Sequence, residues 1–352
     1  MADYPQTSEL ALGVDLGGTK IFVILADAAG RVVSESQLLT PPTYGELEVF
    51  DTILEGVARV LSAGEPGGHA PQTVTERIHR GRIRLISEGR PVVGLGIGVA
   101  GVVSGCGNII CQAPNLGWKD VGFRRRLEIA VGLPVLMDND TNVAAWGEYC
   151  YGGHGRPESL VYLGVGTGIG GGIVLKGKLY KGSSGGAGEI GHVVVEPGGP
   201  VCSLGHPGCL EAMASGLAIA RIAKEEVRRG RADSLLPYAD GDPELLTAQV
   251  VGTAVADGNP LAQEILTRAG TYLGIGIASV INILNPEVVV IGGGVARMGE
   301  AFLAPIQREL EVRAFPELRR AVRVCLSGLG RPVGALGASA MFFQRKLYSE
   351  DG

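Results

Sequence analysis

The sequence predicts an α/β protein, because runs of β-branched and aliphatic residues alternate with segments whose apolar residues recur at helical spacing. Its 352 residues are enough for roughly two domains, and a hydrophobic content of 45% is enough for sizeable cores. The 57 glycines are interleaved with valine, isoleucine and leucine and follow no collagen-like period. We therefore expect glycine to serve mainly the turns between strands.

Seven segments have the composition of strands. They are Leu10 to Asp15, Ile21 to Ala26, Val92 to Val99, Pro134 to Met137, Ser159 to Val165, Gly172 to Leu175 and Val288 to Ile291. Helical spacing recurs from Leu47 to Leu61 and from Leu261 to Ser279, a segment that Pro286 closes. A further helix is predicted from Thr73 to Glu88, and we assign no role to Ser62 to Arg90.

The composition argues against several classes of protein. A net charge of -5 and a pI near 5.7 disfavour a general nucleic-acid-binding protein, because phosphate binding draws on clustered lysine and arginine. The N-terminal residues lack the features of a secretory signal, and polar residues interrupt the longest apolar stretch, Leu273 to Ile291, so no membrane span is expected. Six scattered cysteines favour reduced thiols and a cytoplasmic protein.

A pattern of strand, glycine turn and strand occurs twice, around residues 15–20 (Asp-Leu-Gly-Gly-Thr-Lys) and around residues 166–168 (Gly-Thr-Gly). Closely spaced glycines let backbone N–H groups approach an anion, and Thr19 or Thr167 adds a hydroxyl. Neither copy has the spacing of a Walker A motif or of a dinucleotide fingerprint. A single copy would be equally consistent with a plain hairpin, but the repetition predicts two phosphate loops for one nucleotide.

Three further positions fit this interpretation. Asp15 ends a predicted buried strand beside the first turn, where a carboxylate can hold Mg²⁺, usually through water. The three consecutive glycines 292–294 exceed what a strand-to-helix connection needs, and such a turn suits the flat face of an adenosine. At Asp138-Asn139-Asp140 a strand stops and a helix starts, and Asn139 or Asp140 is a good N-cap. Capping leaves one aspartate free to accept the proton of a hydroxyl that attacks a γ-phosphate.

One loop gathers coordinating side chains, namely Glu189, His192, Cys202, Cys209 and Glu211. Its glycines and proline let the backbone fold tightly enough to bring distant ligands together. Two buried thiols with a core histidine are the alternative, since a free cysteine behaves as a small hydrophobe. That alternative does not account for the carboxylates, so the pattern predicts a metal-binding loop flanked by acids.

In their order along the chain these motifs resemble the ROK family of sugar kinases, and most of all its bacterial glucokinases. The resemblance covers nearly the whole chain and is carried by Asp15-Leu-Gly-Gly-Thr-Lys20, Gly98-Val-Ala-Gly101, Ala113-Pro-Asn115-Leu-Gly-Trp118, Asn139-Asp140-Thr-Asn142, Gly166-Thr-Gly168, Glu189-Ile-Gly-His192, Cys202 to Glu211 and Gly292-Gly-Gly294. Each motif alone is weakly specific, whereas the ordered set is highly specific.

The resemblance implies an α/β fold of the actin-like ATPase (ribonuclease H-like) type, with two α/β domains around a cleft. The smaller domain is expected to comprise residues 1–138 plus 334–352, with a returning helix from Gly334 to Arg345, and the larger one residues 139–333. ROK kinases commonly dimerise through the larger domain, so a homodimer is implied. The expected partners are a sugar and a nucleotide, without nucleic acid or membrane.

The resemblance also assigns roles to residues. Asp140 corresponds to the catalytic base, which takes the proton of the sugar 6-hydroxyl as that oxygen attacks ATP. The sugar-binding positions are Gly101, Asn139, Glu189, His192 and Glu211. The nucleotide and Mg²⁺ positions are Asp15, Gly17, Gly18, Thr19, Gly166, Thr167 and Gly168, with Gly293 near the adenosine. Carboxylates, amides and imidazoles suit this task, because each buried sugar hydroxyl needs a partner.

The zinc site of the family is a histidine followed by Cys-x-Cys-Gly-x-x-Gly-Cys, and here Leu204 replaces the middle cysteine. His192, Cys202 and Cys209 therefore supply three of the four ligands that a structural zinc prefers, and His206 is a candidate for the fourth. Without zinc, packing around Leu204 and the thiols would have to position His192.

The predicted function is an ATP-dependent glucokinase, and the segment Asn115 to Trp118 favours glucose over other sugars. One alternative is a kinase of N-acetylmannosamine, N-acetylglucosamine or fructose. Another is a sugar-responsive repressor, a class that the same family contains. Such repressors carry a helix-turn-helix before the first phosphate loop, where this chain has only about ten residues. The glycine loops suit ATP and polyphosphate alike as phosphoryl donor.

Overall fold

A computed structural model describes residues 9–62, 86–87, 90–231 and 234–344. The chain divides into two compact units. Unit 1 comprises Met1–Arg156, Gly172–Ala187 and Arg331–Gly352, and unit 2 comprises Pro157–Gly171 and Gly188–Gly330. This division differs from the predicted domains, because residues 139–156, 172–187 and 331–333, assigned to the larger domain from the sequence, belong to unit 1.

Unit 1 contains a mixed sheet in the order β3-β2-β1-β5-β4, with β9 also paired to β5. Its strands are β1 (Leu10–Leu16), β2 (Lys20–Asp27), β3 (Val32–Leu39), β4 (Ile86–Ser87), β5 (Arg90–Val99) and β9 (Val135–Asn139). β2 runs antiparallel to β1 and β3, whereas β1, β5 and β9 are parallel. The carboxyl ends of β1, β5 and β9 therefore meet at one edge, as the sequence-predicted site requires.

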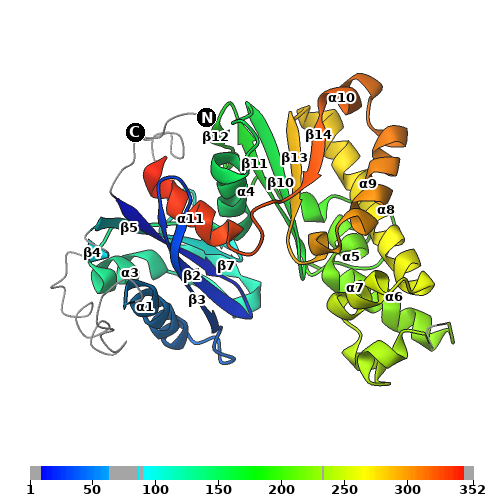
Figure 1. The fold of residues 1–352 in the computed structure, drawn as a ribbon, viewed down its shortest axis with the longest axis horizontal. Helices are drawn as coiled ribbons and strands as arrows, with labels where there is room; N and C mark the ends of the chain where they lie inside the picture. Colours follow the sequence, from blue (N-terminus) through cyan, green and yellow to red (C-terminus); the bar gives the residue numbers. More distant parts are fainter. Residues whose placement is uncertain (1–8, 63–85, 88–89, 232–233, 345–352) are drawn as a thin grey trace. The chain divides into compact units, whose positions relative to one another are not determined.

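Helices cover both faces of this sheet (Figure 1), with α1 (Glu46–Ser62) and α3 (Phe123–Val131) on one face and α4 (Asp140–Tyr151) and α11 (Val333–Phe343) on the other. The alternation along β2 divides the core accordingly. Val23 and Leu25 join the cluster under α1, while Ile24 and Ala26 pack against α11. A small sheet of β6 (Val102–Val103), β7 (Ile110–Ala113) and β8 (Trp118–Val121), with the 3₁₀ turn η1 (Pro114–Leu116), adjoins β9.

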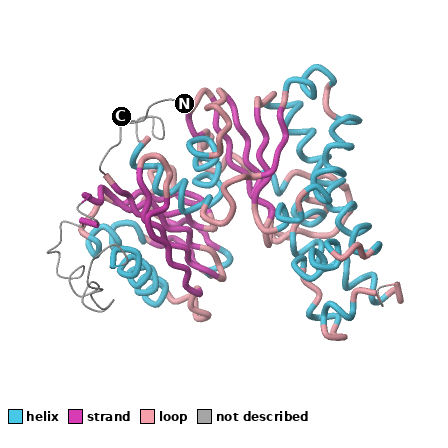
Figure 2. The backbone as a smooth tube through the Cα atoms, viewed as in Figure 1, coloured by secondary structure: helices cyan, strands magenta, loops and turns pink. Residues whose placement is uncertain are grey.

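Unit 2 is mainly helical (Figure 2), and its core strands belong to a sheet in the order β12-β11-β10-β13-β14. These strands are β10 (Ser159–Val165), β11 (Ile169–Leu175), β12 (Lys178–Leu179), β13 (Val288–Gly292) and β14 (Arg323–Leu326), and the division between the units falls within β11. The α-helices are α5 (Leu210–Ala214), α6 (Gly216–Arg228), α7 (Ala248–Ala256), α8 (Pro260–Leu284), α9 (Glu300–Arg313) and α10 (Pro316–Ala321). The 3₁₀ turns are η2 (Ile190–His192), η3 (Leu236–Ala239), η4 (Pro243–Leu245) and η5 (Val295–Met298).

The two sheets repeat one topology. In each, the strand that leads into a glycine turn (β1 or β10) lies between the strand that follows the turn (β2 or β11) and a parallel partner (β5 or β13). The repeat seen in the sequence is therefore a repeat of strand order as well, and each glycine turn has the same place in its sheet.

All seven predicted strands exist, with ends that differ by at most three residues, and α1 and α8 match the predicted helical spacing. The returning C-terminal helix is α11, and its predicted end at Arg345 lies outside the described residues. Most of the predicted helix from Thr73 to Glu88 also lies outside them, but its residues 86–87 form the strand β4.

None of the described helices is long and apolar enough to cross a membrane. All six cysteines lie in described segments as free thiols.

Candidate functional site

The first glycine turn, residues 15–20, is a tight reversal between β1 and β2, and hydrogen bonds from Thr40 hold it in place. Gly17 N–H donates to the carbonyl of Lys20 at 3.0 Å. Thr40, at the end of β3, donates from its hydroxyl to the carbonyl of Gly17 at 2.7 Å and from its N–H to that of Thr19 at 3.0 Å. The side chains of Thr19 and Lys20 are exposed, so these contacts hold the turn while leaving its outer face accessible.

Asp15 lies at the end of β1 next to α11. A Cβ added to Gly334 in α11 would lie 2.7 Å from Oδ2 of Asp15, so the glycine at this position leaves room for the carboxylate. Burial raises the pKa of Asp15 to about 6. A divalent cation favours the ionised form of a carboxylate in such a place, and Asp15 therefore suits the Mg²⁺ position predicted from the sequence.

The second glycine turn, residues 166–168, is held by backbone contacts within unit 2. Gly166 N–H donates to the carbonyl of Gly168 at 2.9 Å. The first residues of α6 then donate back to the turn, Gly216 to the carbonyl of Gly166 at 2.7 Å and Leu217 to that of Thr167 at 3.3 Å. The hydroxyl side chain of Thr167 remains exposed.

Gly293 lies beside the second glycine turn. It follows β13, which is parallel to β10, and its φ is +89°, a conformation that glycine adopts readily. A Cβ at this position would overlap the carbonyl oxygen of Val165, the residue before the turn. The structure therefore brings together two groups of predicted nucleotide-binding residues that are more than a hundred positions apart in the sequence.

The three residues of the acidic strand end, 138–140, have different contacts. Asn139 is the N-cap of α4, and its Oδ1 accepts from the N–H of Thr141 at 2.9 Å and of Asn142 at 3.1 Å. Its Nδ2 donates to the carbonyl of Gly101 at 2.9 Å, so two predicted sugar-binding residues are in direct contact. Asp140 is the first residue of α4, where the helix dipole favours a negative charge.

Asp138 is buried, with 4% of its surface exposed, and its carboxylate is fully engaged. Oδ1 accepts from the N–H of Asn139 at 2.7 Å and from Nδ2 of Asn142 at 3.0 Å. Oδ2 forms an ion pair with Lys181. Of the two aspartates considered in the sequence, Asp140 is thus the one at the helix start, and Asp138 is a buried, ion-paired group.

Glu211 lies in the first turn of α5 and connects two parts of unit 2. Its Oε1 accepts from the hydroxyl of Ser203 at 2.6 Å, and its Oε2 accepts from the N–H of Ile169 at 3.4 Å, just after the second glycine turn. Glu189 is exposed, and its Oε2 lies 3.8 Å from Nε2 of His192, which ends η2. The predicted sugar-binding residues Glu189 and His192 are therefore neighbours.

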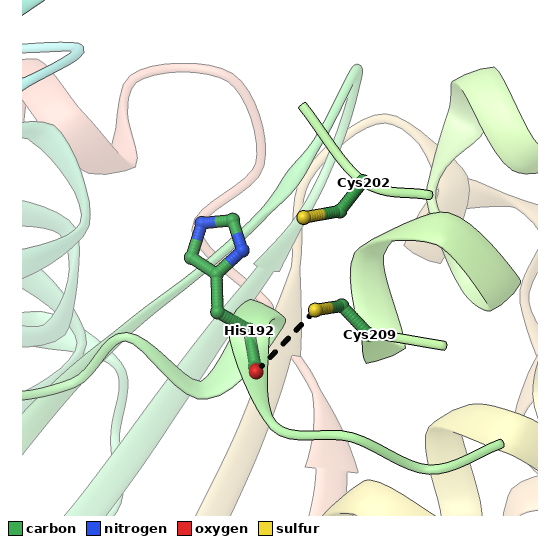
Figure 3. A group of neighbouring side chains, drawn as sticks. All are labelled: His192, Cys202 and Cys209. Atoms are coloured by element: carbon green, nitrogen blue, oxygen red, sulfur yellow. Dashed lines mark hydrogen bonds between the residues drawn. The ribbon is translucent and has the colours of Figure 1, made fainter. Parts of the chain in front are cut away.

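His192, Cys202 and Cys209 form a compact group (Figure 3), in which one potential ligand atom of each residue lies within 4.8 Å of the others. Both thiols are buried, and Sγ of Cys209 donates to the carbonyl of His192 at 3.5 Å. Nδ1 of His192 is buried and has no hydrogen-bond partner among the described residues. A buried imidazole nitrogen beside two thiols fits a zinc ion, which would supply the missing partner.

Leu204 is 51% exposed at the tip of the 202–209 loop, so it does not pack behind His192. Trp118 ends the segment that favours glucose in the sequence, and it is 5% exposed, contacts Phe123 and donates from Nε1 to the carbonyl of Tyr44 at 2.7 Å. His206 is exposed and does not belong to the ligand group among the described residues.

Sequence reasoning missed three residues of the site. Thr40 carries no motif, and its role depends on the pairing of β2 with β3. Ser203 lies in the predicted metal-binding loop, but its contact with Glu211 needs the folded loop. Lys181 could have been sought from the sequence, because a buried second aspartate in the acidic strand end requires a cation.

A sequence model of the ROK family matches residues 65–345 of the chain. The chain belongs to the ROK family. A glucokinase of Halalkalibacterium halodurans is 35% identical to it over 97% of each chain, and a putative xylose repressor of a Caldicellulosiruptor species is 35% identical over 97% of this chain and 80% of the repressor. The structure of a ROK family glucokinase from Streptomyces griseus in complex with glucose and AMPPNP is 33% identical, with a TM-score of 0.78 over 94% of this chain and 98% of that one. The fold is the actin-like ATPase fold of the ROK sugar kinases, as predicted.

Proposed function

We propose that this protein is an ATP-dependent hexose kinase whose acceptor is glucose. The observation that carries the proposal is the strand end 138–140, which presents a carboxylate at a helix start and fixes the adjacent amide on Gly101. Its relatives support the same conclusion, since the Halalkalibacterium and Streptomyces griseus proteins are glucokinases that align over almost the whole chain, and the latter was solved with glucose and an ATP analogue.

In the proposed reaction the 6-hydroxyl oxygen of glucose attacks the γ-phosphorus of ATP. A new bond forms between that oxygen and phosphorus, the bond to the β-phosphate oxygen breaks, and ADP leaves. Asp140 accepts the hydroxyl proton, as a carboxylate within hydrogen-bond reach of the nucleophile would do. Gly101, Asn139, Glu189, His192 and Glu211 bind the sugar hydroxyls in this proposal.

The two glycine turns, residues 17–19 and 166–168, bind the phosphates in this proposal, and Gly293 borders the adenosine. Asp15 holds Mg²⁺, and the ion would neutralise charge on the transferring phosphoryl group when bound. The raised pKa of Asp15, the accessible hydroxyls of Thr19 and Thr167 and the contact of Gly293 with the second turn support these assignments.

We also propose that His192, Cys202 and Cys209 hold zinc, which would fix the orientation of His192. The buried Nδ1 of His192, which has no partner among the described residues, supports this assignment. Leu204 stands where the family motif has its middle cysteine, so the described residues supply three ligands. Metal analysis of the purified protein tests it, with Cys209→Ser as the comparison. Zinc at well below one equivalent in the unaltered protein would contradict it. The homodimer and the functional domains 1–138 plus 334–352 and 139–333 remain proposals carried by the family resemblance, and the cytoplasmic location remains a proposal based on the scattered cysteines.

The replacement Asp140→Asn tests the assignment of the base. The amide keeps the size of the side chain and its place at the start of α4 but cannot take the proton, so kcat should fall by a factor of about 10² to 10⁴ while the melting temperature changes little. Activity is measured by following ADP formation with a panel of glucose, mannose, fructose, N-acetylglucosamine and N-acetylmannosamine, each with ATP and with polyphosphate. Unchanged turnover in the variant would reject Asp140 as base, and a preference for another sugar would reject glucose as the substrate.

A sugar-responsive repressor is the second candidate, because the putative xylose repressor matches this chain as well as the glucokinase does in identity. The purified protein should show sugar-dependent ADP formation and no sequence-specific binding to DNA upstream of its own gene. A specific DNA complex that sugar dissolves, together with no phosphoryl transfer, would favour the repressor.

A further inference from the structure

The ion pair between Lys181 and Asp138 is a second feature of the strand end 138–140. Asp138 is in β9, and Lys181 follows β12, so residues more than forty positions apart meet within unit 1. Asp138 has a side-chain exposure of 6% and Lys181 of 26%. A carboxylate this deeply buried is costly unless it is paired, and Lys181 supplies the positive charge.

The Asp138 carboxylate connects directly to the backbone that carries the proposed base. Its Oδ1 accepts from the N–H of Asn139 and from the side-chain amide of Asn142, one turn into α4. The two donors, Asn139 and Asn142, lie before and after Asp140 in the sequence. The position of Asp140 therefore depends on where the Asp138 carboxylate is held, and Lys181 holds its other oxygen.

Lys181 is itself fixed in the segment that leads towards Glu189. Its carbonyl accepts from the N–H of Ala187 at 3.0 Å, which closes the glycine- and serine-rich loop 181–187. Within that loop, a Cβ on Gly185 would lie 3.5 Å from the carbonyl oxygen of Val103 and from Cα of Gly105, so the loop packs on the turn between β6 and β7. The lysine side chain thus connects a packed loop with the end of β9.

We propose that Lys181 is a positioning residue for phosphoryl transfer, which sets the Asp138 carboxylate and through it the geometry of Asn139 and Asp140. This inference rests on the proposed kinase function. It assigns no contact between Lys181 and either substrate. Replacing Lys181 should therefore lower turnover and kcat/KM for the sugar, and it should leave nucleotide binding unchanged.

The test compares Lys181→Met with Lys178→Met, an exposed lysine three positions earlier in β12. Lys181→Met should lower kcat/KM for glucose by about 100-fold, because a displacement of about 1 Å at a catalytic group has an effect of this size, and should leave KM for ATP within about twofold. Lys178→Met should behave like the unaltered protein. Equal kcat/KM in the two variants, or a loss that falls on KM for ATP, would overturn the proposal.

A double variant keeps the test decisive if Lys181→Met folds poorly. Asp138→Asn combined with Lys181→Met removes both charges and retains the carbonyl oxygen that can accept from Asn139 and Asn142. The kcat/KM of this double variant should therefore be at least tenfold higher than that of Lys181→Met alone. This recovery is the signature of a coupled pair, and a merely additive loss would contradict it. If the unaltered protein phosphorylates no sugar, the kinase proposal fails, whereas an active protein with no coupling between positions 138 and 181 leaves that proposal intact and rejects this inference.

Discussion

The two glycine turns have nearly the same sequence context but are held in different ways. The first, residues 15–20, is fixed by a side chain from a neighbouring strand, Thr40, and follows a carboxylate, Asp15. The second, residues 166–168, is fixed by backbone N–H groups at the start of α6, and a glycine occupies the position that matches Asp15. A repeated strand order thus provides two similar turns, while different elements packed around them hold each turn in place.

The largest expected difference between the turns concerns Asp15. Its folded pKa of about 6 lies above the ordinary aspartate value of 3.8, so the folded state binds the proton more tightly than the unfolded state does. The free energy of unfolding that Asp15 contributes is therefore fully present below pH 4 and is lost as the pH rises through about 6, a change on the order of 3 kcal/mol. Asp15→Asn should flatten this part of the pH dependence, as measured by urea unfolding between pH 4 and 8 without divalent cations.

The control for Asp15 is Asp51→Asn on the exposed face of α1, which should leave the pH dependence of unfolding as it is. Added Mg²⁺ should stabilise the unaltered protein at pH 8 more than the Asp15→Asn variant. If the unaltered protein and Asp15→Asn have the same pH dependence of unfolding, the pKa of Asp15 is not raised in the folded state.

A smaller effect is expected where α6 meets the second turn. A Cβ on Gly216 would lie 2.7 Å from the carbonyl oxygen of Gly166, so Gly216→Ala must displace the turn or the helix. We expect a loss of about 1–3 kcal/mol in unfolding free energy and a KM for ATP raised by about tenfold. Kinetics and thermal melts check this result. Gly122→Ala, at the start of α3 with no atom within 4 Å of the added Cβ, is the matched control, and equal effects at both positions would contradict the prediction.

The smallest effect is expected at Thr40. Thr40→Val keeps the shape of the side chain but removes the bond to the carbonyl of Gly17, at an expected cost of about 1 kcal/mol and a KM for ATP raised by a few-fold. Thr40→Ser restores the hydroxyl and should recover most of the difference. Thr52→Val, which removes a hydroxyl from an exposed position of α1, should change neither quantity. If Thr52→Val has the larger effect, the hydroxyl of Thr40 does not hold the first turn.

Much of the fold could be predicted because its signals are local. Strands such as Ser159–Val165 are short, continuous apolar runs. Helix α8 (Pro260–Leu284) has Asn259 as its N-cap and Asn285 as its C-cap, and Pro286 follows. The strands β3 and β14 were missed, because β3 exposes half of its residues and both depend on pairing with a neighbour. The small strand β4 in place of a helix end has the same cause.

The candidate site divides in the same manner. Residues with strong chemical signals, such as Asp140, His192 and the two thiols, could be proposed from the sequence, and the structure brings His192, Cys202 and Cys209 together. An aromatic residue beside a predicted sugar motif can equally belong to the core, and only the burial of Trp118 shows that it does. Leu204, which replaces the middle cysteine of the family motif, lies at an exposed loop tip.

The sequence by itself determined the family, the repeated glycine turns and the types of side chain available for phosphoryl transfer, because these are properties of residues close together in the chain. Only the tertiary structure decided which aspartate of the strand end is buried and paired, which groups hold each turn, and that Nδ1 of His192 has no hydrogen-bond partner among the described residues. Such decisions depend on burial and on contacts between distant segments, and electrostatic and hydrogen-bond energies change most strongly with these two quantities.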